Sequence, residues 1–254
     1  MTLALITGGH SGLGLETTAQ LQVLGIEVEA PTRRQLDLGD PGSIRAFVSA
    51  FLASGRQLDL LICNAGIMAT PEARVGDGWE SQFAVNHLGH YALVNLLRPA
   101  LAEGARVIVL ASGPGSINWD DPQFERGYDK WGAYGQSKAA NRLFAAELDR
   151  QAAPAVRAFS VTPGYILTPL QRHLTRDEMV DAGWTDDAGN PVHPAFISPA
   201  EGAATTVWAA TTPALDGLGG LHLEESAVVG PIDPTDAERL WQYSAELTGI
   251  NAFG

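Results

Sequence analysis

The sequence predicts a single α/β domain, residues 1–254, in which helices cover both faces of a doubly wound parallel sheet. Short apolar runs alternate along the chain with longer segments of helical period, which is typical of βαβ units. The first apolar run leads directly into a glycine-rich loop that opens a helical segment. No internal repeat or linker divides the chain, so we expect one domain.

The expected strands are short and apolar, as buried parallel strands are, and they occupy residues 3–6, 26–30, 58–62, 106–110 and 156–161. Helices are expected where apolar side chains recur every three or four residues, at residues 16–24, 82–101 and 134–150. Residues 112–131 and 168–199 show neither pattern. Irregular stretches of that length are uncommon unless they have a function.

The composition indicates a folded, acidic protein. Hydrophobic residues make up 45% of the chain and charged residues 18%, which is enough for a substantial core. The formal net charge of −13 repels phosphate backbones, so we expect no nucleic-acid partner. Residues 1–9 lack the pattern of a signal peptide, and no apolar run is long enough to span a bilayer. A soluble, cytoplasmic protein without membrane contact is therefore expected.

Cysteine and histidine patterns predict no metal site. Cys63 is the only cysteine, so an intramolecular disulfide or a cysteine cluster is excluded, and its place in an expected strand suggests core packing. His10 lies in the glycine loop, while His87 and His90 flank Asn86 without a third ligand. We expect these histidines to be structural or solvated.

The glycine loop, TGGHSGLG at residues 7–14, has the position of a nucleotide-binding loop. Gly8, Gly12 and Gly14 let the backbone turn tightly and approach a pyrophosphate, and the helix N-terminus adds N–H groups and a positive dipole end. The spacing is G-x-x-x-G-x-G instead of the common G-x-G-x-x-G. We expect the loop, including Ser11 and Leu13, to bind a dinucleotide.

The chain resembles the short-chain dehydrogenase/reductase family over nearly its whole length. The resemblance rests on T-G-x-x-x-G-x-G in the loop, N-A-G at 64–66, Asn86 in VNHLGHY, Ser112 at a strand end, Y-x-x-x-K at 134–138 and P-G at 163–164. The segments NAGIM, DGWESQFAVNHLGHYALVNLL and YGQSKAANRLFAAEL are similar to the branch that contains retinol dehydrogenases and the oxidoreductase domains fused to WW modules. The resemblance implies a Rossmann fold.

The resemblance also implies hydride transfer between a nicotinamide and a carbonyl or secondary alcohol, with Asn86, Ser112, Tyr134 and Lys138 as catalytic residues. A phenol can exchange a proton with the substrate oxygen only if its pKa falls from about 10 toward neutral. The chain has two lysines, and Lys138 follows Tyr134 by four residues, so its ammonium should favour the phenolate from the same helix face. By resemblance, Lys138 also holds the nicotinamide ribose, Ser112 binds the substrate oxygen, and Asn86 interrupts its helix and holds a water of the proton relay.

The cofactor is expected to be NADP(H), with NAD(H) disfavoured. An NAD-preferring site places an acidic residue at the end of the second strand, but Thr32 stands there, followed by Arg33 and Arg34. A guanidinium can bind a 2′-phosphate and stack on adenine. The cofactor-binding residues that the loop, this strand end and the resemblance imply are Gly8, Ser11, Gly12, Leu13, Gly14, Thr32, Arg33, Asp37, Leu38, Asn64, Ala65, Gly66, Tyr134, Lys138, Pro163, Gly164, Ile166 and Thr168.

The segment after the second strand departs from the family pattern. TRRQLDL runs almost directly from Arg33 to Asp37 and Leu38, which resemble the pair that contacts adenine. The second crossover is therefore expected to be shortened, with its helix missing or reduced to a turn. The adenosine side of the cofactor should then be more open.

Residues 168–199 correspond to the substrate lid of the family. They carry Leu170, Leu174, Met179, Trp184 and Phe196, so we expect a small, mostly apolar ketone, aldehyde or alcohol as substrate. A homo-oligomer, either a dimer or a tetramer, is expected. Two alternatives stay open: an extended-type nucleotide-sugar reductase or epimerase, and a catalytically inactive NADP-sensing regulator that uses the same fold.

Overall fold

The computed structural model describes residues 2–113, 115–231 and 234–254. Pro114, which belongs to the irregular stretch expected at residues 112–131, lies outside the described residues, as does Met1.

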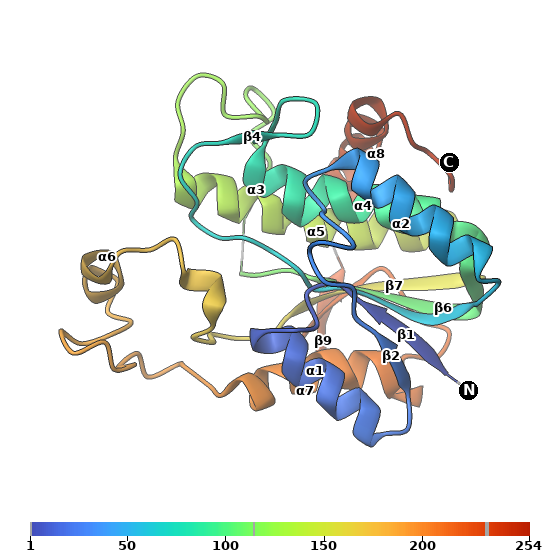
Figure 1. Cartoon of the computed structure of the whole chain (residues 1–254), viewed down its shortest axis with the longest axis horizontal. Helices are drawn as coiled ribbons and strands as arrows, with labels where there is room; N and C mark the ends of the chain where they lie inside the picture. The colour runs from blue at the N-terminus through green and yellow to red at the C-terminus, as the bar shows by residue number, and fades with distance from the viewer. Residues whose placement is uncertain (1, 114, 232–233) are drawn as a thin grey trace.

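A central sheet organises the described chain (Figure 1). Its strand order is β2-β1-β3-β6-β7-β8-β9, parallel from β2 to β8, with β9 antiparallel to β8. The five expected strands are all present, four of them with at most small shifts at their ends and the one expected at 106–110 beginning already at Leu101, while β8 and β9 are additional. The strands are β1 (Leu3–Ile6), β2 (Glu27–Glu29), β3 (Leu58–Cys63), β6 (Leu101–Leu110), β7 (Val156–Thr162), β8 (Leu221–Glu224) and β9 (Ala227–Pro231).

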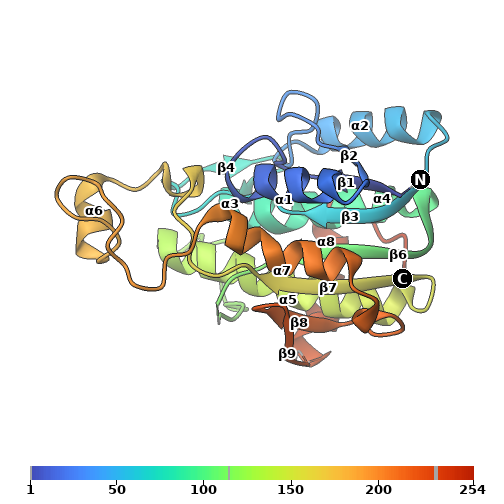
Figure 2. The same ribbon diagram turned by 90° about the horizontal axis from the view of Figure 1, so that it is seen from below.

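Helices cover both faces of the sheet, as the sequence predicts. Figure 1 shows α2, α4, α5 and α8 above the sheet and α1 and α7 below it, and Figure 2 shows α1 and α7 side by side from below. Each layer encloses its own apolar cluster against one face of the strands. The helices are α1 (Gly12–Val23), α2 (Pro41–Ala53), α4 (Gly89–Leu96), α5 (Lys130–Ala152), α7 (Pro199–Thr211) and α8 (Pro234–Thr248).

The connection from β2 to β3 is short at its start. The Thr32 carbonyl accepts hydrogen bonds from the amides of Gln35 (2.9 Å) and Leu36 (3.0 Å), which makes a single turn. The connection to β3 nevertheless contains a full helix, so the expectation that the helix of this crossover is missing or reduced to a turn is wrong. The chain then enters α2, which is not among the helices that the sequence predicts. Asp40 caps α2 by accepting from the Gly42 amide at 2.8 Å.

The single helix expected at residues 82–101 is divided. It consists of α3 (Ser81–Phe83), a π-helical turn η1 (Ala84–Leu88), α4 and a 3₁₀ turn η2 (Arg98–Ala100), and Leu101 already begins β6. The buried carboxylate of Glu80 starts the run by accepting from the amides of Gln82 and Phe83. The π-helical turn is centred on Asn86, so the helix is interrupted where the resemblance implies.

Two further helices differ from expectation at their ends. The helix expected from residue 16 begins at Gly12, directly in the glycine loop. The helix expected at 134–150 spans Lys130–Ala152, because Asp129 caps it through the amides of Trp131 and Gly132. The remaining elements are β4 (Arg74–Val75), β5 (Trp79–Glu80), η3 (Pro169–Gln171), α6 (Arg176–Asp181) and η4 (Pro213–Leu215).

Candidate active site

A cleft of about 1110 Å³ lies at the carboxyl ends of the parallel strands, the usual ligand position in an open α/β sheet. Residues that directly follow β1, β3, β6 and β7 line it. Every residue that the sequence predicts to bind the cofactor lines this cleft, from Gly8 to Thr168. Of the four candidate catalytic residues, Ser112, Tyr134 and Lys138 line it and Asn86 does not.

The glycine loop packs tightly against the segment that follows β3. A Cβ atom added at Gly14 would lie 2.3 Å from the Gly8 carbonyl oxygen, so the backbone itself fills that space. The Thr7 hydroxyl accepts from the amides of Asn64 (3.0 Å) and Ala65 (2.9 Å), and the Asn64 side-chain amide donates to the Thr7 carbonyl (2.8 Å). The N-terminus of α1 therefore opens onto a cleft with a fixed wall, which suits a pyrophosphate.

Tyr134 lies on α5 and Ser112 follows β6, and both residues line the cleft, where the Ser112 side chain acts on the Tyr134 phenol. Burial raises the pKa of Tyr134 to about 12, and Ser112 acts in the opposite direction. The sequence predicts a pKa lowered toward neutral by Lys138, whereas in this structure burial raises the pKa of Tyr134. Loss of solvation around the phenol is the dominant effect.

Lys138 is almost completely buried, with 5% of its surface exposed. Burial lowers its pKa to about 8. Its ammonium donates to the Leu110 carbonyl at 3.0 Å, and the same oxygen accepts from the Asn141 side chain at 2.8 Å. Because an ammonium has three donors, the remaining N–H groups stay available to a ligand in the cleft.

Asn86 lies behind the cleft wall and holds two of its segments together. Its side-chain oxygen accepts from the Ile67 amide (2.8 Å), and its nitrogen donates to the Ile67 carbonyl and to the Ser137 hydroxyl (both 2.9 Å). The Ser137 hydroxyl in turn donates to the Tyr134 carbonyl at 2.8 Å. Ser137 is a site residue that the sequence reasoning missed, although it lies within YGQSK itself.

The expected adenosine end of the cleft carries the residues after β2. Arg33 is 79% exposed in its side chain, and its Nε forms an ion pair with Asp37 at 3.1 Å. The Thr32 hydroxyl donates to the Gln35 side chain at 2.8 Å. His10 also lines this cleft, with its ring 2.6 Å from the Ala30 carbonyl, and was not predicted to do so.

The opposite end of the cleft is aromatic. Trp131, Trp184 and Phe196 line it, with the two indoles edge to face at 5.9 Å and Trp184 edge to face with Phe196 at 6.2 Å. Leu170 also lines the cleft, whereas Leu174 and Met179 do not. Residues 168–199 include α6, which an ion pair between Glu178 and Lys130 connects to the first residue of α5.

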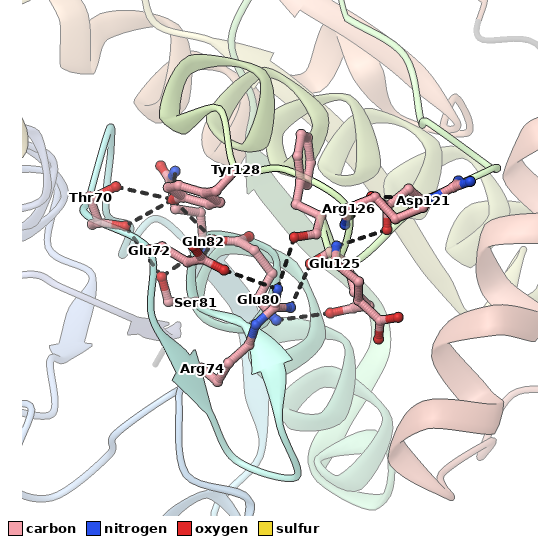
Figure 3. A network of polar contacts seen from close by, with 12 residues as sticks. Thr70, Glu72, Arg74, Glu80, Ser81, Gln82, Asp121, Glu125, Arg126 and Tyr128 are labelled. Carbon is pink, nitrogen blue, oxygen red and sulfur yellow. Dashed lines mark hydrogen bonds and ion pairs between the residues drawn. The ribbon is translucent and has the colours of Figure 1, made fainter.

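A polar network that includes Thr70, Gln82 and Tyr128 connects the loop after β3 to the start of α5 (Figure 3). The Gln82 side chain accepts from the Ala69 amide (2.8 Å) and donates to the Tyr128 hydroxyl (2.8 Å) and the Lys130 carbonyl (2.9 Å). The Tyr128 hydroxyl donates to the Thr70 carbonyl at 3.1 Å. The start of α5 is thereby fixed to the loop that follows β3.

Three further titratable groups, His87, His90 and Cys63, are buried. Burial lowers the pKa of His87 to about 3 and that of His90 to about 4, so both imidazoles are neutral and neither is solvated. Burial raises the pKa of Cys63, which packs in the core. Across residues 2–113, 115–231 and 234–254, no group of three or more His, Cys, Asp or Glu side chains could hold a metal ion. Within the same ranges, no helix combines the length and apolar character that crossing a bilayer requires.

Comparison with known proteins gives consistent matches. Residues 30–179 match the short chain dehydrogenase family. The "Probable oxidoreductase" of Streptomyces antibioticus is 38% identical, with 96% of each chain covered. Retinol dehydrogenase 14 of Homo sapiens is 34% identical, with 97% of this chain and 86% of that protein covered.

Solved structures share the fold. An uncharacterised protein of Mycobacterium paratuberculosis superposes with a TM-score of 0.72 at 32% identity and covers 100% of this chain and 95% of its own. The 3-alpha-hydroxysteroid dehydrogenase of Pseudomonas sp. B-0831, solved with NADH, has a TM-score of 0.70 at 24% identity, and the match covers 88% of this chain and 94% of that chain. A small-chain dehydrogenase solved with NADPH has a TM-score of 0.61 at 20% identity, and the match covers 90% of this chain and 99% of that chain.

Proposed function

The chain belongs to the short-chain dehydrogenase family, and on that premise we propose that it is an NADP(H)-dependent oxidoreductase. It would transfer a hydride between the nicotinamide and the carbon of an apolar ketone, aldehyde or secondary alcohol. The observation that carries the proposal is that Ser112, Tyr134 and Lys138 line the same cleft as the glycine loop.

In the proposed reaction the bound cofactor supplies or accepts the hydride, and the chain's own residues handle the oxygen. Ser112 and Tyr134 together bind the carbonyl oxygen. With a pKa of about 12, Tyr134 keeps its proton at neutral pH, so it is suited to protonate the oxygen as a carbonyl is reduced. Alcohol oxidation requires the reverse transfer, from the substrate hydroxyl to the phenolate.

Lys138 and Asn86 have supporting roles in the proposal. Lys138 would direct its free N–H groups at the cofactor ribose, since its one protein bond, to the Leu110 carbonyl, orients the ammonium. Both N–H groups of the Asn86 side chain are already used. Asn86 can therefore hold a relay water only through an oxygen.

The preference for NADP(H) is supported by charge. Asp37 is the only carboxylate among the described residues that line the cleft, although the whole chain carries a net charge of −13. The hydrogen bond from Arg33 to Asp37 uses the Nε–H group of the guanidinium, so the other N–H groups of Arg33 are not bonded to Asp37. A 2′-phosphate would accept charge-assisted hydrogen bonds from those groups. Structural neighbours solved with NADH and with NADPH support a nicotinamide cofactor in general.

The apolar substrate is supported by the aromatic end of the cleft, where Trp131, Trp184 and Phe196 would enclose it. Residues 168–199 would act as the lid over that end. The expected cytoplasmic location and homo-oligomeric state stay predictions, to be measured by fractionation and light scattering.

The test is to follow nicotinamide absorbance with NADPH or NADH and a panel of ketones and aldehydes that differ in polarity. We expect turnover with NADPH and apolar carbonyls. Turnover of charged or phosphorylated substrates alone would contradict the substrate class. No turnover with any substrate, combined with tight NADPH binding, would favour the regulatory alternative.

A further inference from the structure

A buried chain of hydrogen bonds connects the two halves of the candidate site through His90. The imidazole Nδ1 lies 2.9 Å from the Asn86 carbonyl, and Nε2 lies 2.8 Å from the Thr7 hydroxyl. That hydroxyl also accepts from the amides of Asn64 and Ala65. A single side chain therefore contacts both the π-helical turn and the residue that fixes the wall after β3.

The partners determine the tautomer of His90. A carbonyl can only accept, so Nδ1 must carry the proton that bonds Asn86. Nε2 then has a lone pair that accepts the Thr7 hydroxyl proton, and the two lone pairs of that hydroxyl take the amides of Asn64 and Ala65. The Thr7 hydroxyl also lies 3.5 Å from the Ile62 carbonyl, but its contact with the imidazole is shorter, at 2.8 Å, so the hydroxyl proton is directed at His90. Burial, assisted by the nearby charge of Lys138, lowers the pKa of His90 to about 4 and keeps the imidazole neutral.

Both ends of this chain belong to the proposed machinery. Asn86 bonds Ser137, which bonds the Tyr134 backbone, so a shift at Asn86 would move the phenol. Asn64 and Ala65 line the cofactor cleft. A Cβ atom added at the next residue, Gly66, would lie 3.1 Å from the Asn86 side-chain oxygen, so the two halves are in close contact.

We propose that His90 is a positioning residue that couples the Asn86 turn to the cofactor wall, so that cofactor binding and proton transfer share one geometry. The inference rests on the proposed function, because it concerns the same reaction. The sequence predicts only that His90 is structural or solvated, and the proposal gives it a role in positioning the site.

His87 provides a matched control on the same helical run. It is also fully buried and neutral, but its Nε2 bonds the Ser244 hydroxyl of α8 at 2.7 Å, on the side away from the cleft. Its ring packs against Phe83 and Phe144. Substituting His87 removes a buried imidazole whose hydrogen bond and ring contacts involve neither Thr7 nor a residue that lines the cleft.

The experiment compares His90→Phe, His87→Phe and Tyr134→Phe in thermal stability, kcat and the cofactor KM. His90→Phe should lower kcat and raise the cofactor KM, each by about tenfold, as expected for a lost buried hydrogen bond. His87→Phe should lower the melting temperature to a similar extent while kcat and KM stay within about twofold of wild type. Equal kinetic effects in both histidine variants, or none in His90→Phe, would overturn the inference.

The isosteric variant Thr7→Val tests the coupling if His90→Phe does not fold. It removes the hydroxyl that His90 contacts, so it should lower kcat as well as weaken cofactor binding, and Thr7→Ser should restore both. Where both variants fold, His90→Phe should have a smaller effect in the Thr7→Val background than in wild type, and additive effects would contradict the coupling. Failure of the proposed function is distinguishable, because wild type would then show no turnover, or Tyr134→Phe would retain full turnover, whatever the His90 variants do.

Discussion

Tyr134 and Lys138 stand one helical turn apart on α5, and burial shifts their pKa values in opposite directions, to about 12 and about 8. Both shifts favour the neutral form, because a charge loses solvation in the protein interior. The sequence predicts the pair and its place on one helix face, but it cannot predict how deeply the pair is buried. Burial depends on segments that are distant in sequence and meet only in the fold.

The first prediction concerns pH. With a pKa of about 12, Tyr134 is protonated from about pH 6 to 10, so its ionisation should not limit carbonyl reduction in this range. Alcohol oxidation needs the phenolate, whose population rises about tenfold per pH unit below the pKa. Initial rates in both directions at saturating cofactor should therefore show oxidation rising with pH. An oxidation rate that does not change over this range would contradict the assigned role.

The second prediction concerns Arg33, which lines the cleft, and Arg34, which does not. Arg33→Ala should weaken NADPH binding by about one to two decades, because removing a charged partner of a phosphate costs on the order of 1.5–3 kcal/mol. NADH binding should change little. Arg34→Ala is the matched control and should leave both affinities near wild type. Equal NADPH and NADH affinities in the unmodified protein would contradict the assignment of Arg33.

At the scale of elements, sequence patterns predict strands better than interrupted helices. The five expected strands are present because buried apolar runs leave few alternatives. The helix α2 is not predicted, although Asp40 and Pro41 form a helix-start signal and buried Ile44, Val48 and Phe51 follow at helical spacing. The strands β8 and β9 are not predicted either, although Leu221 and Leu223 alternate with polar residues and residues 227–229 form a short apolar run.

The division of residues 81–100 has a tertiary cause. Periodicity predicts one helix because its apolar side chains keep helical spacing across the π-helical turn. The turn places Asn86 where its amide bonds both backbone groups of Ile67, a contact 19 residues away in sequence. Only the resemblance, and no local pattern, points to an interruption there.

The third prediction compares two ion pairs that connect elements. Lys130–Glu178 joins α5 to α6 with side chains that are 27% and 36% exposed, so Lys130→Met should change the free energy of unfolding by less than about 1 kcal/mol. Arg157–Asp149 joins β7 to α5 with side chains 18% and 10% exposed and two bonds of 2.8 and 2.9 Å. Arg157→Met should cost about 3 kcal/mol, because it leaves a buried carboxylate without its partner.

Denaturant unfolding of both variants measures these costs. If residues 168–199 act as a lid, Lys130→Met should also raise the substrate KM, since α6 loses its ion pair to the start of α5. Arg157→Met should leave the substrate KM near wild type, as its partners lie away from the cleft. A large stability loss in Lys130→Met with an unchanged substrate KM would contradict the role given to this pair.

At the scale of the whole molecule, the parallel order of β1, β3, β6 and β7 collects the site at one edge of the sheet. The motifs that the sequence shows as separate fragments end these strands or begin the helices after them. Strand order alone therefore predicts that these motifs converge. The hydrogen bonds of Thr7, His90 and Ser137 depend on side-chain contacts that no motif indicates. The acidic surface and the cleft with its single described carboxylate also emerge only at this scale.

The central claim is that this converged site transfers a proton through Tyr134. The most direct measurement compares turnover with NADPH, and NADPH affinity, in wild type, Tyr134→Phe and a control variant, Tyr243→Phe. Tyr243 is a suitable control because its hydroxyl accepts a hydrogen bond from Gln123 outside the cleft. General acid–base catalysis raises rates about 10²–10⁴-fold. Tyr134→Phe should therefore lose at least about two decades in kcat, while its NADPH affinity stays within about twofold of wild type. Tyr243→Phe should resemble wild type in both quantities. Wild-type turnover in Tyr134→Phe would contradict the claim.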